Sequence, residues 1–248
     1  MKLPDRITPD RLRDSIIQLQ FSSQYPLEII IGECSKLLHS LGWRYQNRLP
    51  AKQQQPGLLI DLGGNQPQHF FVEEKIRIQI QNNKTLSFNI NGQYPGWSIY
   101  SELVHKVIDL LLSNKILTSI ERIGLRYISQ FPNMDMTDSI NLKLSLPEKM
   151  GSLQNSSYRL SFREENVINT VNIANNILTT PGIIVNDQHV QKAMFSSTID
   201  IDVTQFGLSI TTMEQFKKNL DVIHTKEKEL FFNIIADEFL ETLNPEYS

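Results

Sequence analysis

Apolar and polar residues alternate along much of this chain, with the period of two that is typical of a β-strand with one buried face. The first such stretch covers residues 13–21, and a run of antiparallel strands is expected after it. Further strands are predicted at residues 58–62, 70–73, 76–80, 86–90, 120–128, 140–146, 158–162, 167–173 and 199–203. Turn residues at 82–84 and 164–166 predict hairpins within this set.

Three stretches instead repeat apolar residues every three or four positions, which predicts amphipathic helices. The first covers residues 26–41, and the second begins with Ser98 as its N-cap and ends near residue 112. The third begins at the capping-box pattern Thr211-x-x-Glu214. Its apolar stripe is interrupted at residues 225–229, which predicts a bend or a change of the buried face.

The order of these elements predicts an α+β fold, with mainly antiparallel sheet packed against a few amphipathic helices. The strand at 120–128 is expected to be internal to the sheet, beneath the helix at 98–112. We divide the chain into an N-terminal α+β half at 1–132 and a C-terminal half at 133–248, with one continuous domain as the alternative. Both halves end their strands with a helix, so a structural duplication stays open.

Composition narrows the functional classes only slightly. The chain has 248 residues, a formal net charge of -3 and 40% hydrophobic residues, which is ordinary for a globular protein. This charge gives no global reason to bind nucleic acid, although a local basic patch stays open. Cys34 is the one cysteine and lies among apolar residues at helical spacing, so it is expected to be a buried structural thiol.

The sequence gives no sign of a membrane protein. The N-terminal residues lack the apolar core of a signal peptide, and no apolar run approaches the ~20 residues that span a bilayer. We therefore expect a cytoplasmic protein with no membrane partner.

The strand at 120–128 carries the first candidate site residues. Arg122 and Arg126 share one of its faces, about 13 Å apart at ~3.3 Å per residue, with Gly124 between them. Guanidinium groups at this spacing suit an anion-binding platform for a phosphate or a carboxylate partner. The alternative is a pair of structural arginines that satisfy nearby carboxylates or carbonyls.

Asp200 and Asp202 share one face of the strand at 199–203. Two carboxylates in this arrangement suit a hard cation such as Mg²⁺, but no third acidic motif accompanies them. The alternative is a solvated strand face that pairs with the arginines. Since arginine cannot lose its proton, we predict that Arg122 or Arg126 bonds to a carboxylate, with Asp200 and Asp202 as the leading candidates.

The five histidines lie apart, and none has the spacing of a helical zinc site. His224 falls in the polar gap of the last helix, where a structural histidine is the expected interpretation and a site residue the alternative. No nucleophile motif or phosphate loop is present in the sequence. We therefore assign no catalytic residue, no metal site and no cofactor, and keep Arg122, Arg126, Asp200, Asp202 and His224 as ligand- or partner-binding candidates.

Several of these features occur together in one family. They are Trp97 before an amphipathic helix, Ile-Glu-Arg-Ile-Gly-Leu-Arg-Tyr-Ile at 120–128, Ile-Asp-Ile-Asp-Val at 199–203, and a terminal helix with His224. The chain resembles a sporadically distributed prokaryotic family of uncharacterised proteins of about this length. The resemblance implies no activity. Patchy distribution is common among mobile-element and antiviral-defence genes, so it implies a role in such a system.

The leading hypothesis is a non-catalytic binding or sensor protein that acts through a protein partner. The alternative is a metal-dependent enzyme that acts on nucleotides or nucleic acid with Asp200, Asp202 and the arginines, which requires these side chains to converge. A third hypothesis, nucleic-acid binding without catalysis, needs a basic face that the net charge does not indicate.

Overall fold

The protein is described by a computed structural model. The described residues are 3–4, 6–48, 68–81, 84–90, 93–142, 155–180, 183–185, 188–191 and 194–247. Within them the chain is α+β, with a nine-stranded antiparallel sheet and four helices, which confirms the predicted fold class. The predicted strand at 58–62 and the turn at Pro181-Gly182 lie outside the described residues.

The helices are α1 (Leu27–His39), α2 (Trp97–Ser113), α3 (Met213–Ile234) and α4 (Asp237–Thr242). The strands are β1 (Leu12–Ser22), β2 (Arg44–Arg48), β3 (Gln68–Val72), β4 (Ile76–Gln81), β5 (Thr85–Ile90), β6 (Ser119–Pro132), β7 (Ser156–Glu164), β8 (Val167–Thr180), β9 (Ile183–Val185), β10 (Gln188–Gln191) and β11 (Met194–Ile210).

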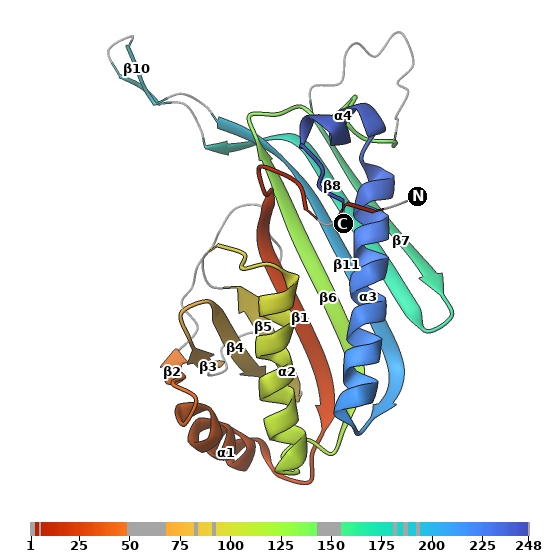
Figure 1. Cartoon of the computed structure of the whole chain (residues 1–248). Coiled ribbons are helices and arrows are strands. Elements are labelled where there is room, and N and C mark those ends of the chain that lie inside the picture. The colour runs from red at the N-terminus through yellow and green to blue at the C-terminus, as the bar shows by residue number, and fades with distance from the viewer. Residues whose placement is uncertain are drawn as a thin grey trace. The chain divides into compact units, whose positions relative to one another are not determined.

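The strand order of the large sheet is β2-β3-β4-β5-β1-β6-β11-β8-β7, and β9 and β10 form a separate hairpin (Figure 1). The order places β6 between β1 and β11, which confirms that the strand predicted at 120–128 is internal. The predicted hairpins are also present, because β4 pairs with β5 and β7 pairs with β8.

The chain forms two compact units. Unit 1 contains Met1–Ser15, Leu125–Gln205 and Asp221–Ser248, and unit 2 contains Ile16–Gly124 and Phe206–Leu220. The elements β1, β6, β11 and α3 therefore each contribute residues to both units.

Unit 2 is built around the alternating apolar residues of its strands. Ile17 and Leu19 of β1 are fully buried, as is Phe88 of β5. Helix α2 is anchored over β5 and β1, because the Tyr100 hydroxyl donates to the Phe88 carbonyl at 2.7 Å and accepts from the Ile17 backbone N–H at 3.1 Å. These bonds hold the helix on β5 and β1, and β1 is the neighbour of β6 in the sheet.

Two helix boundaries in unit 2 differ from the sequence predictions. Helix α2 begins at Trp97 after Gly96, which has a φ of 91°, so Ser98 lies inside the helix and is not its N-cap. Helix α1 ends at His39, and Leu41 beyond it is 50% exposed, although its spacing placed it on the buried stripe. Cys34 is 1% exposed, and burial raises the pKa of its thiol to about 12, which confirms a buried thiol.

In unit 1 the strands β6, β11 and β8 divide their side chains sharply between two faces. Ile199, Ile201 and Val203 of β11 are buried, while the aspartates between them are half-buried. Helix α3 packs on the apolar face, since its His224 contacts Tyr127 of β6. One face is thus a helix-covered core, and the opposite face is polar.

Helix α3 starts and continues differently from the prediction. Thr212, not Thr211, is the N-cap: its hydroxyl accepts from the Gln215 N–H at 3.3 Å, and the Gln215 side chain accepts from the Thr211 N–H at 3.0 Å. The N-cap is therefore shifted by one residue, and the Gln215 side chain reaches the residue before it. The helix continues through the polar gap at 225–229, where Glu227 extends the buried face at 2% exposure.

The prediction of a strand at 140–146 is wrong for residues 140–142, the part of this stretch that the structure describes. Ile140 forms a single bridge with Ile235, and the next two residues are not in a strand. The remainder, from residue 143, lies outside the described part of the chain. Ile140 is nevertheless buried at 2% exposure, so its apolar character reflects packing against the end of α3.

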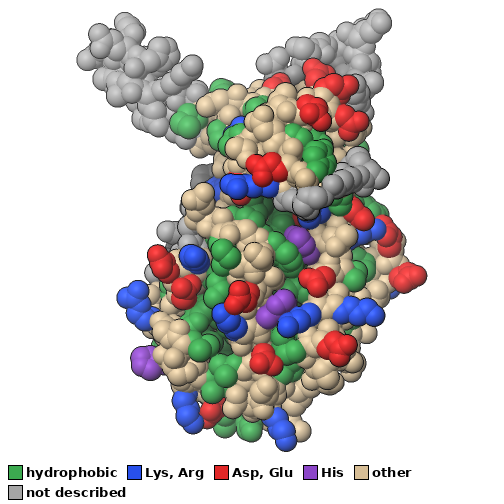
Figure 2. Space-filling view, in the orientation of Figure 1, with side chains coloured by type: hydrophobic (Ala, Val, Ile, Leu, Met, Phe, Trp, Pro, Cys, Tyr) green, Lys and Arg blue, Asp and Glu red, His purple; other side chains and the backbone are tan. Residues whose placement is uncertain are grey.

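Charged side chains of both signs are interspersed on the face seen in Figure 2, and acidic side chains gather over α4. Asp237 and Glu238 occupy the first turn of this helix, where negative charge complements the helix dipole. Among the described residues on this face, basic side chains are spread between acidic ones.

Candidate functional site

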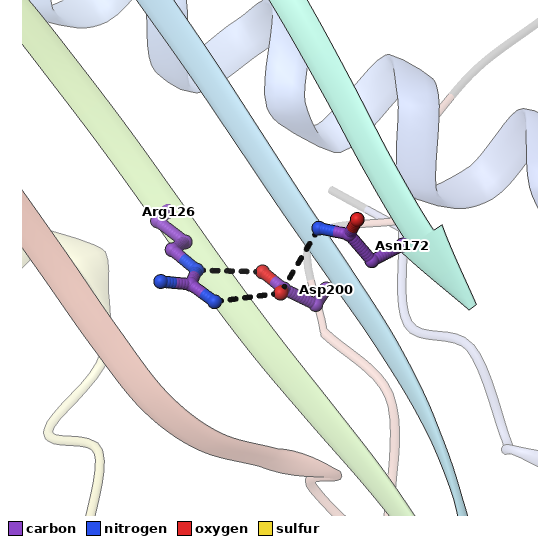
Figure 3. A network of polar contacts seen from close by, with 3 residues as sticks. All are labelled: Arg126, Asn172 and Asp200. Carbon is purple, nitrogen blue, oxygen red and sulfur yellow. Dashed lines mark hydrogen bonds and ion pairs between the residues drawn. The ribbon is translucent and has the colours of Figure 1, made fainter. Parts of the chain in front are cut away.

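A polar network crosses three strands of unit 1 on the face opposite α3 (Figure 3). Arg126 of β6 donates two hydrogen bonds to Asp200 of β11, from Nε to Oδ1 at 2.8 Å and from the guanidinium NH2 to Oδ2 at 2.7 Å. Asn172 of β8 donates to Asp200 Oδ2 at 3.2 Å. The prediction that one of the two arginines bonds to a carboxylate is therefore confirmed.

Strand periodicity brings these three side chains together. Asp200 lies directly opposite Asn172 in the β11–β8 ladder, and β6 is the neighbour of β11 on its other side. Because side chains alternate between faces, the adjacent residues Tyr127 and Ile201 point into the core. The same alternation that builds the core thus aligns the polar network.

Electrostatics fix the charge state of this network. The hydrogen bonds that Arg126 donates to Asp200 raise the pKa of Arg126, burial lowers it, and the charges of Asp200, Asp202 and Asp14 raise it further. The side chains of Arg126 and Asp200 are 27% and 13% exposed. The guanidinium is therefore permanently charged and held bidentate, which is the strong form of this interaction.

The same contacts weaken the metal hypothesis for Asp200 and Asp202. Both oxygens of Asp200 already accept hydrogen bonds from within the chain. Asp202 Oδ1 accepts from the Thr204 hydroxyl at 3.0 Å. In the part of the chain that the structure describes, no group of three or more His, Cys, Asp or Glu residues is placed to hold a metal ion.

Arg122 has a different environment from Arg126. It lies in unit 2, where its guanidinium donates to the side-chain carbonyl of Gln18 on β1. Its Nε is buried without a hydrogen-bond partner among the described residues. Arg122 thus meets an uncharged acceptor, whereas Arg126 meets a carboxylate.

His224 lies on the opposite face of the sheet from Arg126. Its ring meets Tyr127 edge-on, with centroids 6.2 Å apart and planes at 71°. Burial, aided by the charge of Lys228, lowers the pKa of His224 to about 3, so its ring is neutral at pH 7. Since Tyr127 and Arg126 are adjacent on one strand, the sheet itself separates His224 from the Arg126 network.

Sequence reasoning missed one titratable residue in this region. Glu227 lies one helical turn beyond His224 and is 2% exposed. Burial raises the pKa of its carboxyl to about 8, and the nearby charge of Lys228 opposes this rise only partly. It lies in the polar stretch of α3 for which the sequence predicted a bend or a change of the buried face, so the sequence contained no signal for its burial.

A second missed feature is the network around Asn175, which is 2% exposed. Its Oδ1 accepts from the Met136 N–H at 2.7 Å, and its Nδ2 donates to Asp135 and to the Thr137 hydroxyl, both at 2.8 Å. The network ties the turn after β6 to β8. It uses all the amide's polar atoms for structure and leaves none for a ligand.

The third missed feature is the edge strand β7. It is the last strand in the order, and it pairs with β8 through all nine of its residues without a bulge. It contains no proline and no lysine, which are common protections of sheet edges, and its charged residues are Arg159, Arg163 and Glu164. Leu160 and Phe162 are 41% and 39% exposed. Figure 1 shows the β7–β8 hairpin at the side of the molecule, to the right of α3.

No family model, curated protein or solved structure matches the chain. Among the helices of the described residues, none combines the length and the apolar character needed to cross a membrane.

Proposed function

We propose that this chain is a non-catalytic binding protein that acts through a protein partner, which it engages by strand addition along β7. One observation supports the proposal above all others, namely that β7 is a regular edge strand with exposed apolar side chains. An exposed edge strand of this kind can pair unspecifically with strands of other chains. Occupation by a specific partner removes this hazard.

The geometry of β7 suits strand addition. An added strand receives main-chain hydrogen bonds from the edge, and side chains at alternate positions determine which strand is accepted. Because they lie at alternate positions of β7, Tyr158, Leu160 and Phe162 all point to the same face of the sheet, which is the face of the core. Their cross-strand partners on β8 are buried: Ile173, Val171 and Asn169. A partner strand at this edge would therefore extend the apolar core of unit 1.

The polar network supports a scaffold role for the strands behind this edge. Arg126 and Asp200 neutralise each other across β6 and β11, and Asn172 continues the network to β8. These groups are engaged with one another, and His224 lies on the other face of the sheet. These contacts support a structural role for Arg126, Asp200 and His224.

The proposal is tested by affinity capture with tagged full-length protein in its native host, where products of neighbouring genes are the first candidates. The matched variant carries Leu160→Lys and Phe162→Lys, which add edge-protecting charge at two exposed positions. We expect a protein recovered with the wild type to be lost with this variant. Equal recovery with both proteins, or a catalytic turnover with no recovered partner, would contradict the proposal.

A further inference from the structure

We infer that the strand added at β7 is the β7 strand of a second copy of this chain, paired antiparallel about Leu160. This inference rests on the proposed function, because it names the occupant of the same edge. A two-fold axis between identical strands makes an isologous interface, the commonest arrangement in homodimers. It requires a strand whose pattern is complementary to itself when reversed.

The sequence of β7 has this property. With the two-fold axis at Leu160, the Leu160 side chains of the two copies face each other. On each side of the axis, Tyr158 of one copy lies opposite Phe162 of the other. Aromatic and aliphatic cross-strand pairs of this kind stabilise antiparallel ladders. All three side chains lie on the core side of β7, so the pairs would continue the apolar layer across the axis.

Charge selects this register among the alternatives. With Leu160 on the axis, Arg159 lies opposite Ser161, and Arg163 lies opposite Ser157, so no two like charges are directly opposed. An axis at Arg159 would oppose that arginine to itself, and an axis at Ser161 would oppose Arg159 to Arg163 twice. Like charges directly opposite each other are destabilising.

Strand length favours the same register. An axis at Tyr158 would pair only residues 156–160, and an axis at Phe162 only residues 160–164, whereas the axis at Leu160 uses the whole of β7. A full-length antiparallel pair would contribute about 8 to 10 main-chain hydrogen bonds. Glu164 at the end of the strand already pairs with Lys226 of its own chain, so it does not obstruct the edge.

Disulfide trapping tests the register directly. In the proposed pair the Leu160 side chains are directly opposed, at a Cα separation of about 4.5 to 5.5 Å, which a disulfide spans. We expect L160C protein to form a covalent dimer on air oxidation with copper phenanthroline. The matched control is S157C, at an exposed position whose two copies would lie about 20 Å apart along the strands. The native Cys34 is buried and does not interfere.

Charge variants at Ser161 provide a second test, read by sedimentation velocity on the full chain. Ser161→Glu would face Arg159 of the second copy twice and should tighten the dimer about 2- to 30-fold, whereas Ser161→Arg should weaken it by a similar factor. Ser209 of β11 is also an exposed strand serine, and the same two substitutions there should leave the dimer unchanged.

These outcomes separate the inference from the function on which it rests. A wild-type monomer at every concentration, equal cross-linking of L160C and S157C, or equal shifts for both Ser161 variants would overturn the inference. If the wild type is monomeric but captures another protein, and the Leu160→Lys and Phe162→Lys variant does not capture it, the proposed function stands with a different partner. If neither self-association nor edge-dependent capture occurs, both proposals fail.

Discussion

Replacing Glu227 with glutamine should make the protein more stable, and increasingly so as the pH rises. Glu227 is 2% exposed, and burial raises its pKa from the usual 4.5 to about 8. Between these two pH values the folded protein holds a proton that the unfolded chain has released. The wild type therefore has its full stability from this group below about pH 4.5 and loses it as the pH rises through 8.

The size of the effect follows from the linkage between proton binding and folding. Each pH unit within this interval costs about 1.36 kcal/mol of the free energy of unfolding. Glutamine has no proton to lose, so the stability advantage of E227Q should grow by roughly 3 kcal/mol between pH 5.5 and 7.5. The other titrating groups, including His224, contribute equally to the free energy of unfolding of both proteins, so they cancel in the difference between E227Q and the wild type.

Urea denaturation followed by far-UV circular dichroism at the two pH values measures this difference. Glu229→Gln removes an exposed carboxylate from the same helix and controls for the loss of one negative charge. An E227Q advantage that stays constant between pH 5.5 and 7.5 would refute the reasoning. It would show that Glu227 is ionised in the folded protein.

Three further predictions concern stability and are checked by the same denaturation assay. Arg126→Ala should lower the free energy of unfolding by about 2 kcal/mol, between the values for exposed and buried ion pairs, because it leaves Asp200 at 13% exposure without its cation. The double variant R126M/D200L should recover part of this loss, and no recovery would contradict the reasoning. Leu111→Ala should cost about 2–5 kcal/mol because Leu111 is 1% exposed, and a loss below roughly 0.5 kcal/mol would contradict its burial. Because the pKa of His224 is lowered to about 3 in the folded protein, its neutral ring contributes fully to the free energy of unfolding above pH 6.5, and this contribution is lost as the pH falls below that value. His224→Gln should therefore reduce the loss of stability between pH 6.5 and 3. The same loss of stability in the variant and the wild type would contradict the prediction.

The periodicity of the sequence predicted most strands and helices because burial on one face leaves a pattern with period two or 3.6. The Arg126–Asp200 pair was also predictable, because a guanidinium in a sheet needs an acceptor and Asp200 stood on a second alternating strand. Local pattern and the chemistry of one side chain were sufficient for both.

Features that depend on which strands become neighbours were not predictable from the chain. Glu227 lies in a polar run that resembles a solvated helix face, and only packing on the sheet buries it. Asn175 has polar neighbours and gives no sign that four polar atoms will converge on its amide. The role of β7 as an edge follows from the strand order, which is set by contacts between segments distant in sequence.

The interleaving of the two units has a consequence for synthesis on the ribosome. The chain passes between the units four times, and each unit needs a late segment: Phe206–Leu220 for unit 2 and Asp221–Ser248 for unit 1. Neither unit can be completed while the nascent chain ends before residue 206, even though most of unit 2 has long been translated. Every truncation from the C-terminus into these segments therefore removes material from a unit that began near the N-terminus, and a chain that ends before residue 220 leaves both units unfinished.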